Sequence, residues 1–99
     1  MGNVNAPSEC AALRLRLYVA GQAPNSLRAI ANTRAMCAAH FVDHVLEIVD
    51  LMIEPGRALA DRVLVTPTLI KLSPAPESRL IGDLSDAVKL RAALGGGAA

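Results

Sequence analysis

The sequence has few aromatic residues and no surplus of charge of either sign. Of its 99 residues only Tyr18 and Phe41 are aromatic, and ten basic residues face nine acidic ones, for a net charge of +1. A nucleic-acid-binding domain is expected to cluster its basic residues, and a single-strand binder needs aromatic side chains on which bases stack. The basic residues are instead scattered along the chain, so we expect no nucleic-acid partner.

Long apolar runs and targeting patterns are also missing. No apolar run approaches the ~20 residues that cross a bilayer, and the N-terminus lacks the pattern of a signal peptide. We therefore expect a cytoplasmic protein without a membrane partner. A chain of this length fits one domain, and we place it at residues 13–94, between a flexible leader (1–12) and a flexible tail (95–99).

Motifs for catalysis, metal binding and phosphate binding are sparse. Cys10 and Cys37 are far apart in the sequence, and in a reducing cytosol we expect both to be free thiols. His40, Asp43 and His44 could suggest a zinc site, but two histidines four residues apart bind zinc well only when a third ligand faces them on a regular helix. Here the helix is expected to end and no matching ligand is evident, so these residues indicate a solvated helix end. There is no Walker-type phosphate loop. We expect no catalytic residue, no metal and no cofactor, and therefore a protein that is not an enzyme.

The apolar residues recur with strand and helix periods in turn along the chain. Strands are expected at 13–19, 45–50, 66–72 (preceded by the extended residues 63–65) and 79–81, and helices at 25–40, 55–61 and 85–94. The order β-α-β-α-β-β-α combines a parallel β-α-β pair with an antiparallel hairpin. The expected fold is a four-stranded mixed sheet with helices on both faces, which is the thioredoxin-like plan.

The helices have recognisable ends and apolar faces. Asn25 or Ser26 is expected to cap the first helix and Ser85 the last, because their side-chain oxygens accept from free backbone N–H groups. The predicted buried stripe of the first helix is Leu27, Ile30, Cys37 and Phe41, and that of the last helix is Leu84, Val88, Leu90 and Leu94.

Three short stretches of the sequence resemble the KaiB family of clock proteins, in the family's order and spacing over roughly residues 13–94. The first is Leu17-Tyr18-Val19-Ala20-Gly21 followed by Pro24-Asn25-Ser26, the second is Thr66-Pro67-Thr68-Leu69, and the third is Ile81-Gly82-Asp83-Leu84-Ser85-Asp86. In thioredoxin-like folds a proline at the position of Pro67 is usually cis and exposes a strand edge, where a partner could dock; the alternative is a tight turn that only positions the strand.

The resemblance implies a non-catalytic regulator that binds KaiC, a hexameric ATPase, and influences its phosphorylation cycle. KaiA, or a histidine kinase with a KaiB-like sensor domain, competes for or joins such an assembly. The family also has a second, ground-state fold with a rearranged C-terminal half, which is usually tetrameric. The helix-forming composition of residues 85–94 favours the thioredoxin-like form in this chain.

By the same resemblance, the first helix and the second strand make the partner-binding face. The candidates for its exposed rim are Leu27, Arg28, Arg34, His44 and Glu47. The chain departs from the family at Glu47, where a basic residue is common, and in the turn over residues 73–78.

Two alternatives remain open from the sequence. One is a KaiB-like interaction module in stress signalling with no role in timing. The other is a thiol oxidoreductase that uses Cys10 or Cys37. Gln22 and Asn25 argue against redox chemistry, because they occupy the positions at which a thioredoxin carries its two reactive cysteines at a helix start.

Overall fold

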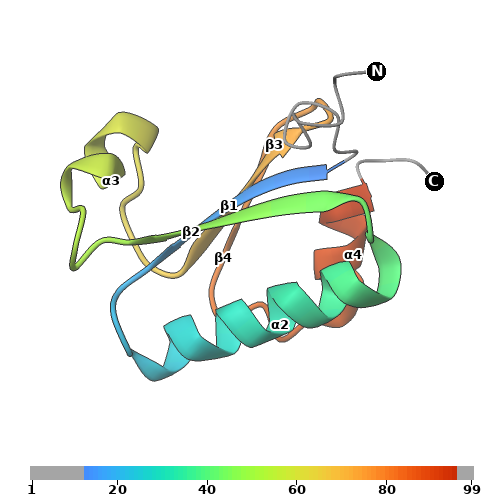
Figure 1. The fold of residues 1–99 in the computed structure, drawn as a ribbon, viewed down its shortest axis with the longest axis horizontal. Helices are drawn as coiled ribbons and strands as arrows, with labels where there is room; N and C mark the ends of the chain where they lie inside the picture. Colours follow the sequence, from blue (N-terminus) through green and yellow to red (C-terminus); the bar gives the residue numbers. More distant parts are fainter. Residues whose placement is uncertain (1–12, 96–99) are drawn as a thin grey trace, which may run out of the picture.

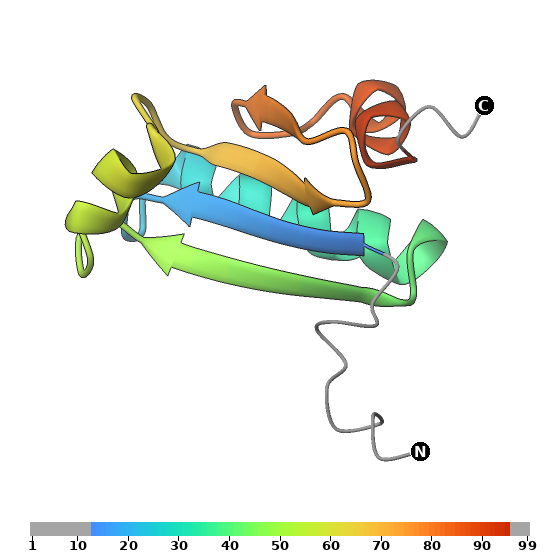
Figure 2. The ribbon, with the colours of Figure 1, turned by 90° about the horizontal axis from the view of Figure 1, so that it is seen from above.

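A four-stranded mixed sheet forms the centre of the structure, a computed structural model that describes residues 13–95 (Figure 1). Its strands run side by side in the order β2-β1-β3-β4 (Figure 2). β1 pairs with β2 in parallel and with β3 antiparallel, and β4 is antiparallel to β3. The bounds are Leu13–Val19 for β1, His44–Asp50 for β2, Thr68–Ser73 for β3 and Ser78–Ile81 for β4. The predicted order of elements is confirmed, whereas the predictions for residues 1–12, Cys10 included, and for 96–99 lie outside the described residues.

The helices lie on both faces of this sheet. α2 (Pro24–His40) and α4 (Ala87–Gly95) cover one face, and the short α3 (Gly56–Asp61) lies at one end of the other (Figure 1). The alternation of β1 explains the division. Its apolar residues, Leu13, Leu15, Leu17 and Val19, are at most 3% exposed and pack against α2 and α4, while Tyr18 lies in a second cluster under α3.

The first helix differs from its prediction in its start and in its buried face. α2 begins at Pro24, because proline suits the first helical position, where its missing N–H is not needed. Asn25 and Ser26 therefore lie inside the helix, and no side chain caps it. The buried residues are Ser26, Ala29, Thr33, Met36 and Cys37. The predicted stripe was right at Cys37 and wrong at Leu27, which is 46% exposed. The reason is that α2 turns a face with several small side chains toward the sheet, and Leu27 lies outside that face.

The last helix starts two residues later than predicted, at Ala87. Asp86, rather than Ser85, caps it: the Asp86 Oδ1 accepts from the Lys89 N–H at 3.0 Å. Leu90 and Leu94 are buried as predicted, but Val88 is 81% exposed. Gly95, predicted as the first residue of the tail, is the last residue of α4.

The third strand is shorter than predicted. Residues 63–65 form no strand, and β3 begins at Thr68, after a cis Thr66–Pro67 peptide bond. Leu64, expected in an extended apolar run, is 94% exposed. The chain enters the sheet only beyond Pro67, since proline cannot donate a hydrogen bond to a neighbouring strand.

Candidate partner-binding surface

The residues of the first motif form the turn between β1 and α2. Gly21 has φ +56°, which favours glycine, and its N–H donates to the Asp50 Oδ1 at 2.9 Å. The Ala20 N–H donates to the Ser26 Oγ at 3.0 Å. These bonds fix the path of the chain from the end of β1 into α2, and therefore determine which side chains lie on the outer face of α2.

The second and third motifs meet at the same end of the sheet. The Pro67 carbonyl accepts from the N–H of Gly82, whose φ is +115°, at 3.0 Å. The Asn32 side-chain amide donates to the Asp83 carbonyl at 2.8 Å. Hydrogen bonds from Ser85 lower the pKa of the Asp83 carboxyl, and nearby Arg28 adds to this effect. These residues tie α2 to the loop that precedes α4.

The five predicted rim residues do not form one patch. Leu27, Arg28 and Arg34 are exposed on α2, and Arg28 pairs with Asp83 at 3.6 Å. His44 lies at the start of β2 on the side of the sheet that faces α2, since it pairs with Leu13 in the ladder. Glu47 lies on the other face of the sheet, beside Arg16, with which it pairs in the ladder. Only a partner that reaches around the edge strand β2 could contact all five.

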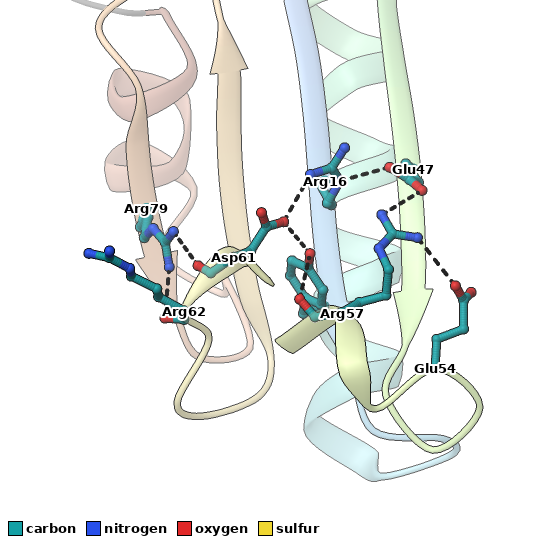
Figure 3. Close-up of polar contacts among 8 residues, drawn as sticks. Arg16, Glu47, Glu54, Arg57, Asp61, Arg62 and Arg79 are labelled. Carbon is teal, nitrogen blue, oxygen red and sulfur yellow. Dashed lines mark hydrogen bonds and ion pairs between the residues drawn. The ribbon is translucent and has the colours of Figure 1, made fainter. Parts of the chain in front are cut away.

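A polar network on the face opposite α2 was not predicted from the sequence (Figure 3). Arg16 pairs with Glu47 at 2.7 Å and with Asp61 at 2.8 Å. Arg57 on α3 pairs with Glu47 at 3.0 Å. The Tyr18 hydroxyl hydrogen-bonds the Asp61 carboxylate. The network therefore joins two strands of the sheet to α3.

The contacts of this network shift the pKa values of its members. A hydrogen bond from Arg16 lowers the pKa of Glu47, and one from Tyr18 lowers that of Asp61. Burial, followed by the hydrogen bond to Asp61, raises the pKa of Tyr18. At neutral pH both carboxylates are ionised and the phenol is neutral, which keeps every pair of the network intact.

We expect acid to loosen this network. A carboxyl whose pKa is lower in the folded than in the unfolded protein stabilises the fold above its unfolded pKa, about 4, and this contribution is lost as the pH falls through the folded pKa. The free energy of unfolding should therefore decline below about pH 4, and decline less steeply in a Glu47→Gln/Asp61→Asn variant. Urea denaturation at a series of pH values measures both slopes. Glu77→Gln, at an exposed turn position, is the control and should keep the wild-type slope; equal slopes in all three proteins would contradict the assignment.

The described residues show little of the chemistry that catalysis needs. Cys37 is buried, and burial raises the pKa of its thiol, which disfavours the reactive thiolate. Within residues 13–95 no cluster of three or more His, Cys, Asp or Glu residues could hold a metal ion. No helix in that range is long and apolar enough to span a membrane. What these residues do offer is an exposed helix face and an edge strand, which suit protein binding.

Comparison with known proteins identifies close relatives. The KaiB domain family matches residues 16–95. A circadian clock oscillator protein KaiB from Synechococcus sp. (strain RCC307) is 45% identical over 73 residues, which cover 73% of this chain and 66% of that protein. Its counterpart in Prochlorococcus marinus (strain MIT 9312) is 44% identical over 77 residues, covering 77% of this chain and 73% of that protein.

Solved structures share the fold. The N-terminal domain of SasA from Synechococcus elongatus superposes with a TM-score of 0.70 at 25% identity, covering 86% of this chain and 81% of that one. Mitochondrial thioredoxin 3 from Saccharomyces cerevisiae gives 0.71 at 14% identity, covering 91% and 82%. The fold is therefore thioredoxin-like, as predicted, and the second match carries the fold alone.

Proposed function

The chain belongs to the KaiB family, and we propose that it regulates a KaiC-type hexameric ATPase by binding to it rather than by catalysing a reaction. The observation that carries the proposal is the KaiB domain match over residues 16–95, together with relatives named as circadian clock oscillator proteins. The turn after β1 supports it, because Gln22 and Asn25 leave no sulfur where a thioredoxin needs two.

The exposed face of α2 is the surface that we assign to the ATPase. Leu27 leaves an apolar side chain 46% exposed in the first turns of the helix, with Arg28 next to it and Arg34 further along. Because Asn32 and Arg28 anchor the loop at Asp83, the helix is held in a fixed position on the domain. A rigid face of this kind binds without the entropic cost of ordering a loop.

We further propose that binding selects the thioredoxin-like form from an equilibrium with a ground-state, oligomeric form. α4 is the element that would rearrange, and only Leu90 and Leu94 of this helix are buried. The ATPase can shift such an equilibrium only by its different affinity for the two forms. KaiA, or a histidine kinase with a KaiB-like sensor domain, would then join or compete for the complex.

The phosphorylation state of the ATPase tests the proposed regulation. The KaiC-type ATPase of the same organism, incubated with ATP, should change its phosphorylated fraction when this chain is added, as measured by gel mobility over a day. Boiled protein is the control. An unchanged phosphorylation time course would contradict the regulatory role.

A further inference from the structure

Most of the exposed apolar side chains in the described part of the chain belong to the segment that contains α3. Nine large hydrophobic residues are exposed within residues 13–95, and five of them lie between residues 52 and 65. They are Met52, Ile53, Leu59, Leu64 and Val65, with exposed fractions from 48% to 94%. Apolar side chains grouped in this way on a soluble domain mark an interaction site. Together with Arg62 and Arg79 we call these residues the α3 surface.

α3 turns its polar side chains and Ala58 toward the sheet, and its one large apolar side chain, Leu59, outward. Arg57 and Asp61 reach across to β1 and β2 (Figure 3), whereas Leu59 is 85% exposed. No residue of α3 is buried, and a helix this short is not stable alone. The network thus holds an apolar side chain in water where its burial would be favourable, and no side chain among residues 13–95 buries it.

The charges beside this surface indicate the sign of the partner. The Arg79 guanidinium donates to the carbonyls of Asp61 at 2.5 Å and of Arg62 at 3.2 Å, at the end of α3 (Figure 3). Neither arginine pairs with a carboxylate among residues 13–95, and the carboxylates of Glu47, Glu54 and Asp61 are already taken by Arg16 and Arg57. The α3 surface therefore combines apolar side chains with two uncompensated positive charges.

We propose that the α3 surface docks an acidic segment of a partner protein, whose apolar side chains cover Leu59 and Leu64 and whose carboxylates pair with Arg62 and Arg79. A second copy of the chain fits poorly, because in a two-fold contact of this surface with itself the arginines of each copy would find no free carboxylate on the other. A membrane fits poorly too, because α3 is six residues long and helices that bind lipid surfaces need a larger apolar face.

This site is independent of the proposed ATPase surface. α2 covers one face of the sheet and α3 lies on the other (Figure 1). The two surfaces could therefore be occupied at the same time by different partners, or by two parts of one assembly.

A titration followed by nuclear magnetic resonance tests the proposal on the full chain. The probe is a short synthetic peptide of leucine and glutamate, compared with the same peptide carrying lysine in place of glutamate. We expect the glutamate peptide, but not the lysine peptide, to shift the amide signals of residues 57–65 and 79–81. Leu64→Ser and Arg62→Glu should weaken its binding about tenfold or more. Val88→Ser and Arg91→Glu, at exposed positions of α4, should bind like the wild type, and circular dichroism should show all four variants folded.

Several results would overturn the proposal. Absence of shifts, shifts confined to α2, or equal binding of the lysine peptide would each do so. Signals of residues 52–65 that move with protein concentration, without peptide, would make a second copy the occupant. Flotation with phosphatidylserine-containing vesicles in the absence of peptide binding would make a lipid surface the occupant.

Discussion

Replacing Leu90 with alanine should lower the free energy of unfolding by about 3 kcal/mol. Leu90 is 2% exposed and lies in the core cluster with β1 and α2. Its truncation removes buried apolar surface and leaves a cavity that the surrounding strands fill only in part. Since α4 buries just one other residue, Leu94, the loss falls on the element that holds the C-terminal half in the thioredoxin-like arrangement. Urea denaturation followed by circular dichroism measures the change.

The matched control lies on the same helix. Val88→Ala removes an apolar side chain that is 81% exposed, so it should change the free energy of unfolding by less than about 0.5 kcal/mol. Equal effects of the two substitutions would show that α4 does not dock on the sheet through Leu90 in solution.

Replacing Leu27 with aspartate should weaken binding to the KaiC-type ATPase about 30-fold, the loss of about 2 kcal/mol that a central interface residue carries. The substitution puts a charge into a contact that we propose to be apolar. It should not unfold the domain, because Leu27 is 46% exposed and a carboxylate near the start of a helix is favoured by the helix dipole. Bio-layer interferometry on the immobilised hexamer measures the affinity.

Val88→Asp provides the comparison for that experiment, since it places the same charge on the exposed face of α4. It should leave the affinity within about twofold of the wild type, as expected for a residue outside the interface. If Leu27→Asp binds as tightly as the wild type, α2 is not the binding face, even if the complex itself forms.

The sequence was sufficient to predict the strands and their order along the chain, because the patterns that indicate them are local. The strict alternation over residues 13–19 placed four apolar side chains on one face of β1, and the structure confirms it. The helix faces were predicted less well. Ala29 and Thr33 are small, and a pattern that weighs large apolar residues selects Leu27 instead. Which side chains a helix buries depends on how closely it approaches the sheet.

The polar network could be predicted only in part. Alternation puts Arg16 and Tyr18 on the face opposite the core, and a parallel register puts Glu47 beside Arg16. The partners from α3 are 45 and 39 residues away along the chain, in the pairs Arg16–Asp61 and Tyr18–Arg57, and no local signal indicates where so short a helix docks. Lys71, which is 1% exposed, could not have been predicted as buried either, because lysine is almost never fully buried.

Size-exclusion chromatography of the protein mixed with the KaiC-type hexamer of the same organism and ATP, sampled over hours, tests the central claim most directly. We predict that the chain elutes with the hexamer and that the bound fraction continues to grow over hours, as expected if the molecules in the proposed ground-state form must convert before they bind. Elution of the two proteins as separate peaks at every time would contradict the claim that this chain is a KaiC regulator.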